Sequence, residues 1–175
     1  ILDSLGIDKN KPEKQQRNQT GSPILEEGDI LLNTTLAETN DWQQVDLPVV
    51  RTLRHFCIET LSSYTEDNQA CISEVDLLDD KGQPIDKTKW EVVYVSSEQA
   101  DKNLGVAENL FDGDISSFWH TDPATEPGQP HRIIVDIKEI YKISALRFKV
   151  RKGAFLSGKV KEINVYGRPQ FFLFH

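Results

Sequence analysis

Residues 107–121 contain the clearest chemical potential in this sequence. The centre of this run, Asp112-Gly113-Asp114, is a turn signal, because glycine tolerates positive φ and aspartate side chains bond nearby backbone groups. Bulky apolar residues on both sides should anchor the turn to a core: Leu110, Phe111, Phe118 and Trp119. A turn that is fixed at both ends and rich in oxygen atoms is a candidate site for a hard cation.

No arrangement of residues predicts catalysis. Glycoside hydrolysis needs two carboxylates held across a cleft, and none of the many acidic residues is paired on converging strands with a reason for a raised pKa. The sequence also lacks a Ser/His/Asp nucleophile elbow, a glycine-rich phosphate loop and a zinc-type cluster. We therefore expect a protein that is not an enzyme.

Length and charge restrict the possible partners. A chain of 175 residues can bury the core of one domain, and its net charge of −8 argues against a surface that follows nucleic-acid phosphates. No apolar run is long enough to span a bilayer, so we expect neither nucleic-acid binding nor membrane insertion. The chain opens at Ile1 without a signal-peptide pattern, and we expect it to be an excised or processed piece of a larger protein.

The two cysteines, Cys57 and Cys71, form no metal-ligand pattern, and one pair is too few for a disulfide framework in a domain of this size. The first interpretation is two buried thiols. The second is a pair that faces across neighbouring strands, because the segment between them resembles a hairpin loop.

Short runs with the pattern of strands follow one another from Gly28 onward, and no long helical period interrupts them. These predicted strands cover residues 29–33, 42–47, 50–59, 71–78, 90–97, 132–138, 143–150 and 160–166. Their number and spacing indicate an all-β antiparallel β-sandwich, most simply a jelly roll. We expect a single domain over residues 23–175, preceded by a flexible polar arm at residues 1–22.

Several of these runs resemble the first half of a discoidin domain, also called the coagulation-factor type C domain. The similar segments are Trp90-Glu91-Val92-Val93-Tyr94-Val95-Ser96-Ser97-Glu98, then 107–121, then Pro130-His131-Arg132-Ile133-Ile134-Val135-Asp136-Ile137, then 143–151 and 158–167. The signature is an Asp-Gly-Asp turn followed by a hydroxyl residue and Trp-His-Thr. The family has a galactose-binding-like fold, and its bacterial sugar-binding members form carbohydrate-binding module family 32.

The second half of the family pattern comes first in this chain. Residues 42–48, 54–63 and 71–78 resemble the closing strands of the family, so residues 23–78 correspond to the usual C-terminal half and residues 88–167 to the usual N-terminal half. Either the domain is circularly permuted, or the tail of one such domain is joined to the head of another. We favour permutation, because two half-domains would leave sheet edges open and apolar faces exposed.

The resemblance implies a structural calcium ion. In many members the ion joins the aspartate turn to a glutamate on the closing strand, which corresponds to Glu74. The implied ligands are carboxylate, hydroxyl and backbone carbonyl oxygens of Asp112, Asp114, Ser117, Glu74 and Asn109, a set that suits calcium rather than zinc. The alternative is a surface turn whose aspartates only cap backbone N–H groups.

The resemblance also implies a sugar site. Its residues correspond here to His120, Arg151, Tyr64 and Ser157. An aromatic ring stacks on the apolar face of a pyranose, and His and Arg donate hydrogen bonds to its hydroxyls. The family often has proline before the arginine, whereas Val150 stands here. Without a sugar, His120 would only cap a loop and Arg151 would be a solvated cation.

We therefore predict a noncatalytic carbohydrate-binding module with a structural calcium ion, whose ligand is a glycan, with galactose-type sugars as first candidates. It would belong to a secreted, periplasmic or cell-surface glycan-processing protein, as a monomer or as part of a larger multidomain chain. The alternative is a structural or protein–protein interaction β-sandwich that does not bind sugar.

Overall fold

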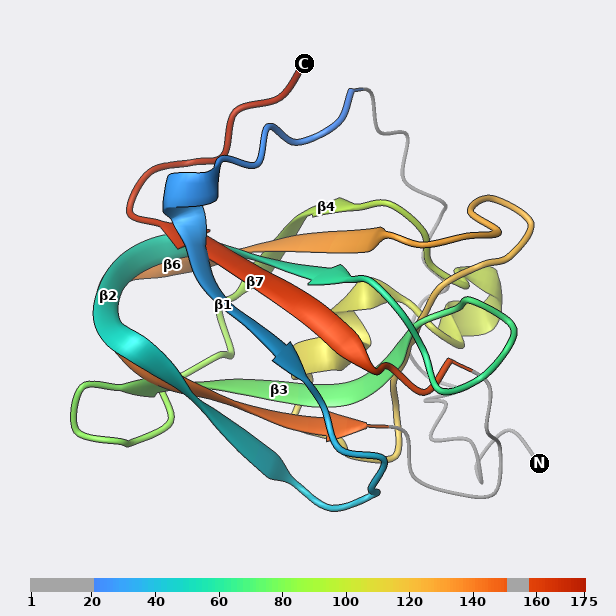
Figure 1. Cartoon of the computed structure of the whole chain (residues 1–175), viewed down its shortest axis with the longest axis horizontal. Coiled ribbons are helices and arrows are strands. Elements are labelled where there is room, and N and C mark those ends of the chain that lie inside the picture. Colours follow the sequence, from blue (N-terminus) through green and yellow to red (C-terminus); the bar gives the residue numbers. More distant parts are fainter. Residues whose placement is uncertain (1–20, 151–157) are drawn as a thin grey trace.

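A computed structural model describes residues 21–150 and 158–175. Figure 1 shows antiparallel strands stacked as a β-sandwich with almost no helix, which confirms the predicted fold class. The strands are β1 (Ile30–Thr35), β2 (Gln43–Thr60), β3 (Cys71–Asp79), β4 (Glu91–Val95), β5 (Trp119–His120), β6 (His131–Val150) and β7 (Glu162–Arg168). The turns η2 (Glu27–Asp29), η3 (Asp101–Asn103) and η4 (Ala107–Phe111) are short 3-10 helices. The predicted flexible arm lies outside the described residues, except for positions 21 and 22.

Two long, bent strands hold the sandwich together. The strand order is β1-β7-β2-β6-β3-β5, and β4 pairs with β6. β2 and β6 pair over three segments, and their register shifts between Asp46 and Arg51 and again between Leu53 and His55. In this region of shifted register the paired strands turn from one layer to the other, as Figure 1 shows. The sequence predicts two strands in each of these places. Pro48 lies within the first shift, where its missing N–H breaks no regular ladder.

The two segments with swapped resemblance share this one sheet. β7 lies between β1 and β2, and β6 lies between β2 and β3, so strands from before and after the connector at residues 80–90 alternate. The connector starts as a tight return, in which Asp79 N–H donates to Gln83 O and Ile85 N–H donates to Leu77 O. A permuted domain requires such interleaving, and the swap itself stays a prediction.

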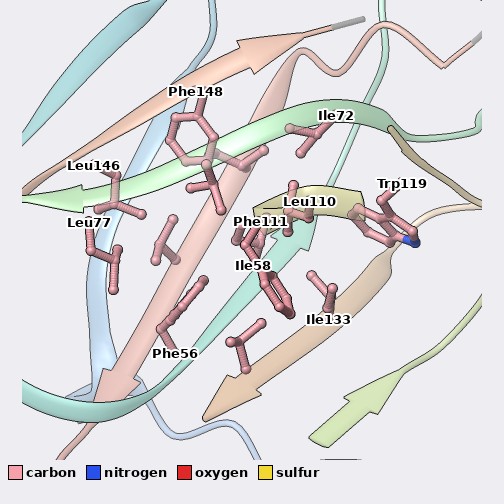
Figure 2. Packing of buried hydrophobic residues seen from close by; sticks show 14 of the residues in the cluster. Phe56, Ile58, Ile72, Leu77, Leu110, Phe111, Trp119, Ile133, Leu146 and Phe148 are labelled. Carbon is pink, nitrogen blue, oxygen red and sulfur yellow. The ribbon is translucent and has the colours of Figure 1, made fainter. Parts of the chain in front are cut away.

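Inward-facing side chains of both layers form the main core (Figure 2). The largest fully buried members are Trp119, Phe56, Phe148, Leu36, Leu53, Ile58, Ile72, Leu77, Leu110, Ile133 and Ile143. Trp119 is buried, as predicted, and so are Trp90 and Phe148. Both residues of β5 and most of η4 are buried too, so the turn between them is anchored at each end. The core therefore fixes the run 107–121.

Both thiols are free and buried, which confirms the first interpretation of the cysteines. Cys57 lies opposite Ile134 and Tyr166 in the sheet, whereas Cys71 lies opposite His120. The two side chains therefore do not face each other across paired strands.

The C-terminal tail packs on the outer face of the sheet. Phe172 is buried there with Cys57, Ile134 and Tyr166 in a second apolar cluster. Its neighbours pair with the first described residues: Ile24 N–H donates to Leu173 O (2.7 Å) and His175 N–H donates to Ser22 O (3.0 Å). The tail thus covers the outward side chains of β2, β6 and β7 as an added strand-like segment.

A buried histidine holds this tail. His55 Nδ1 accepts a hydrogen bond from the Phe172 N–H (3.3 Å), so the imidazole must be neutral to make it. Burial lowers the pKa of His55; Asp136 opposes that shift, and Arg54 and Arg168 add to it. The neutral imidazole is favoured in the fold, while the unfolded chain takes up a proton near the ordinary pKa of 6.5. Stability from His55 is therefore complete above that pH and falls as the pH drops below it.

We expect the free energy of unfolding of the wild type to fall more steeply below pH 6.5 than that of His55→Gln, which keeps an acceptor but cannot titrate there. Chemical denaturation on both sides of that pH measures the difference. His175→Gln, at an exposed position, should keep the wild-type pH dependence. Equal slopes for wild type and His55→Gln would contradict the assignment.

Candidate functional site

The Asp112–Ser117 turn is organised by its own side chains. Asp112 Oδ1 accepts from Asp114 N–H (2.9 Å), and Asp114 Oδ1 accepts from Ser116 N–H (2.9 Å). The Ser117 hydroxyl lies 2.5 Å from Asp112 Oδ2 and 2.9 Å from Asp114 O. Gly113 adopts φ +79°, as the predicted turn requires. The Ser117 hydroxyl therefore lies within hydrogen-bonding distance of two further oxygens, one from Asp112 and one from Asp114.

Asn109 supports this turn from inside. Its side-chain amide donates to Phe118 O (3.0 Å) and Asn103 O (3.2 Å), and the residue is buried. The Trp119 indole N–H donates to Ser97 O (3.0 Å). The amide nitrogen of Asn109 thus has a structural role, and the backbone carbonyl of Asn109 is the oxygen proposed as a cation ligand.

The structure brings Glu74 of β3 to the turn. Glu74 is 1% exposed, and its Oε2 accepts a hydrogen bond from Gly113 N–H (3.1 Å). The same oxygen forms an ion pair with Lys87 from the connector. The other oxygen, Oε1, is buried without a hydrogen-bond partner. Glu74 therefore contacts the turn at Gly113, the residue after Asp112, and its role as a metal ligand stays a prediction.

Two carboxyl groups of this cluster, those of Glu74 and Asp112, have raised pKa values. Burial raises the pKa of Glu74 to about 7, against the opposing effect of Lys87. Asp112 is exposed as a residue, but partial burial of its carboxylate also raises its pKa. Glu74 lies next to this carboxylate, because it accepts the N–H of the following residue, Gly113. A cation at this position would keep both groups ionised.

The donor set suits a hard cation in part. Asp112 and Glu74 can supply carboxylate oxygens, Ser117 a hydroxyl and Asp114 its backbone carbonyl, while one carboxylate oxygen of Asp114 caps Ser116. Within the described ranges, no three His, Cys, Asp or Glu side chains converge as a metal cluster. A calcium ion here would therefore depend on hydroxyl and carbonyl oxygens as well as on two carboxylates.

The predicted sugar residues are only partly visible. Arg151 and Ser157 lie outside the described residues. Tyr64 is 36% exposed, and its hydroxyl donates to Leu36 O (2.8 Å). His120 is buried, with Nδ1 2.6 Å from Thr121 O. The Tyr64 N–H donates to Lys159 O, and the N–H of Cys71, which pairs with His120 in the sheet, donates to Gly158 O. Tyr64 and His120 therefore both lie near the segment that follows residues 151–157.

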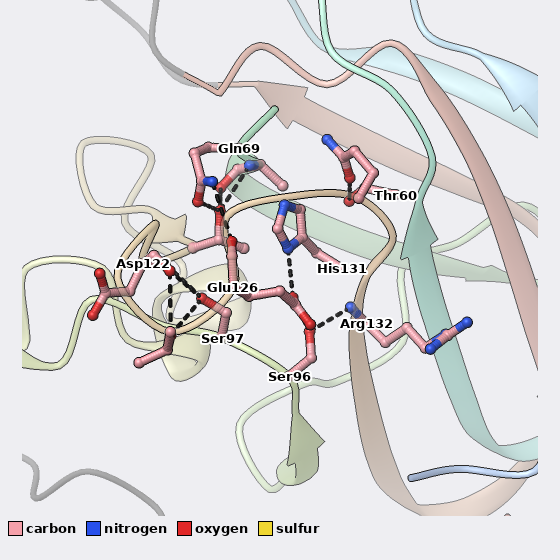
Figure 3. A network of polar contacts seen from close by, with 12 residues as sticks. Thr60, Gln69, Ser96, Ser97, Asp122, Glu126, His131 and Arg132 are labelled. Atoms are coloured by element: carbon pink, nitrogen blue, oxygen red, sulfur yellow. Dashed lines mark hydrogen bonds and ion pairs between the residues drawn. The ribbon is translucent and has the colours of Figure 1, made fainter. Parts of the chain in front are cut away.

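A buried polar network beside these residues was not predicted (Figure 3). Thr121 Oγ1 donates to Gln69 Oε1 (2.6 Å) and accepts from Ala70 N–H (2.9 Å). Gln69 Nε2 reaches Glu126 O (3.2 Å), and the carboxylate of Glu126 lies 2.5 Å from His131 Nδ1. The network fixes the loop at residues 64–70 to the loop at residues 121–130.

His131 connects a third segment to this network. The residue is fully buried, and its Nε2 lies 2.7 Å from Asn68 O. Ser96 Oγ donates to the same oxygen of Glu126 (2.7 Å) and accepts from Arg132 N–H. In the sequence His131 directly precedes the predicted strand at residues 132–138, and β6 starts at this histidine.

A membrane-spanning helix is not found in the part of the chain that the structure describes: none there is both long and apolar enough.

Comparison with known proteins places most of this site in one matched segment. Residues 92–170 match the family model of the F5/8 type C domain, which confirms the predicted resemblance over that segment. A sialidase from Micromonospora viridifaciens is 33% identical over 84 residues, covering 47% of this chain. The aligned part is 13% of the sialidase, so this chain spans a small fraction of that relative. The matched segment includes the aspartate turn, His120 and the strands β5, β6 and β7.

Proposed function

We propose that this chain, with an F5/8 type C segment at residues 92–170, is a noncatalytic carbohydrate-binding module. The observation that supports it most is this match, because it includes the turn and His120, and the similarity to a sialidase adds to it. The module would tether a larger secreted or cell-surface glycan-processing protein to its substrate. Each site would bind weakly, because a shallow sugar site buries little area, so retention would depend on multivalency.

The proposed sugar site combines Tyr64 and His120, which lie beside Gly158 and Lys159, with Arg151 and Ser157, which lie outside the described residues. Tyr64 would stack on the apolar face of the sugar ring, and its hydroxyl bond to Leu36 O holds the aromatic ring in place beforehand. Lys161 lies 5.5 Å from the centre of this ring, so the sugar would use the other face. His120 and Arg151 would donate to sugar hydroxyls, and Ser157 would add a polar contact.

The proposed calcium ion has a structural role. It would join the turn at Asp112, Asp114 and Ser117 to β3 through Glu74, with the Asn109 carbonyl as a further candidate ligand. The buried and unpartnered Oε1 of Glu74 is the observation that supports this part most. The ion would thereby hold the start of β5, and with it His120, against the sheet.

Replacing the stacking and donor residues tests the sugar site. We expect Tyr64→Ala and Arg151→Ala each to weaken binding of galactose-type sugars by at least about tenfold, because stacking and a charged donor are lost. Titration calorimetry, or a glycan array when the sugar is unknown, measures the change.

Tyr141→Ala is the matched control. Tyr141 lies on β6 and its hydroxyl donates to Glu139 Oε2 (2.8 Å), so this variant removes a tyrosine outside the proposed site and should bind as the wild type does. Failure of the wild type to bind any of a diverse set of glycans would refute the sugar site. That result would favour a structural or protein–protein interaction sandwich.

A further inference from the structure

A lysine from the connector lies at the acidic cluster of the aspartate turn. Lys87 Nζ forms ion pairs with Glu74 Oε2 and with Asp76 Oδ1 (2.6 Å) and donates to Val75 O (3.2 Å). Its side chain is 17% exposed, so the ammonium group is largely withdrawn from water. The lysine reaches the cluster because the connector returns along β3 after its tight turn.

The partners of Lys87 differ in how much they depend on it. Asp76 is also bonded by Arg147 Nη2 (2.9 Å), so it keeps a cationic partner if Lys87 is removed. Glu74 has a single ion pair among those the structure describes, and it is the one with Lys87. Lys87 is therefore the charge that lets a buried carboxylate remain at the turn when no metal is bound.

The lysine also lies beside the way into the cluster. A cavity of about 370 Å³ is lined by Lys87, Thr88, Glu108, Phe111, Asp112 and Gly113. A hydrated cation that approaches Asp112 through this opening meets the Lys87 ammonium group at its edge. Two positive charges that share Glu74 repel each other, and the repulsion is strong where little water screens it.

We propose that Lys87 acts as a built-in cation that competes with calcium for Glu74. The inference rests on the proposed calcium site. Lys87 keeps the turn attached to β3 without metal, and it weakens calcium binding because it already neutralises one of the two carboxylates. The fold is thus expected to survive chelation, and metal affinity depends on a residue of the connector.

The test compares Lys87→Met with the wild type, both freed of metal by chelation and then titrated with calcium chloride. Calorimetry gives the dissociation constant and thermal unfolding gives the melting temperature. We expect calcium to bind Lys87→Met at least roughly tenfold more tightly. The metal-free variant should melt about 5 °C or more below the wild type, because Glu74 loses its counter-charge. Saturating calcium should restore most of that difference.

Two variants serve as controls. Lys87→Arg keeps the charge and should bind calcium as the wild type does. Lys89→Met removes an exposed lysine two residues away, so it reports the effect of net charge alone and should also match the wild type. If Lys87→Met yields no folded protein with or without calcium, the same comparison is made with Lys87→Gln.

The outcomes separate the two ideas. If the wild type binds calcium and Lys87→Met binds it equally well or more weakly, the competition is overturned and the calcium site stands. No calcium binding by any variant overturns the calcium site and the competition together. Binding that tightens in Lys87→Met but not in Lys89→Met supports both.

Discussion

Replacing Trp119 by alanine should lower the free energy of unfolding by about 3–5 kcal/mol, the range for a large aromatic residue removed from a core. Trp119 is fully buried next to the aspartate turn, and its indole N–H is bonded to Ser97 O. The substitution leaves a cavity and an unpaired carbonyl in the same place. Urea denaturation followed by circular dichroism measures the loss without relying on tryptophan fluorescence.

Trp42→Ala is the matched control for this experiment. Trp42 is 38% exposed, and Arg147 stacks over its ring at 5.0 Å. Its removal should cost less than about 1 kcal/mol, because exposed cation–π contacts are weak. Similar losses for the two variants would show that Trp119 does not anchor the turn as described.

The second large effect concerns the proposed calcium ion. Calcium at about 100 times its dissociation constant should stabilise the wild type by roughly 2.7 kcal/mol, which raises the melting temperature by roughly 5–10 °C. EDTA should reverse the change. Asp112→Asn should lose at least about tenfold in calcium affinity, because it removes one of only two carboxylate ligands.

Asp114→Asn provides the contrast. The Asp114 side chain caps Ser116, so its proposed contribution to the metal is the backbone carbonyl, which the substitution keeps. This variant should retain most of the calcium response. A wild type whose melting temperature is unaffected by EDTA and by added calcium would count against the ion, and so would equal responses in the two variants.

The strands were predictable because side-chain alternation follows from burial of one face. Val135, Ile137, Leu146 and Phe148 alternate with polar neighbours, and all four are buried. Their continuity was not predictable. Pro48 in β2 and the charged residues Lys138 and Glu139 in β6 interrupt the strand pattern of the sequence, yet the pairing of β2 with β6 continues beyond them in a shifted register.

The candidate site was predictable only where a local pattern marks it. The Asp112 turn has such a pattern, and the family resemblance supplied Glu74 as its partner. Lys87 has none, because the partner of a lysine in a polar connector depends on the path of that connector in space. The contacts of Gln69 and Thr121 likewise join loops that are 52 residues apart. Long-range polar pairs of this kind leave no periodicity in the sequence.

The most direct test of the proposed function is a titration of the isotope-labelled chain with galactose-type sugars, followed residue by residue through amide chemical shifts. We expect saturable shifts concentrated at Tyr64, at His120 and its neighbours, and at residues 151–158, with the bend of β6 at Tyr141 unchanged. No saturable shift with any sugar, or shifts confined to the far end around Tyr141, would contradict a sugar site in this module.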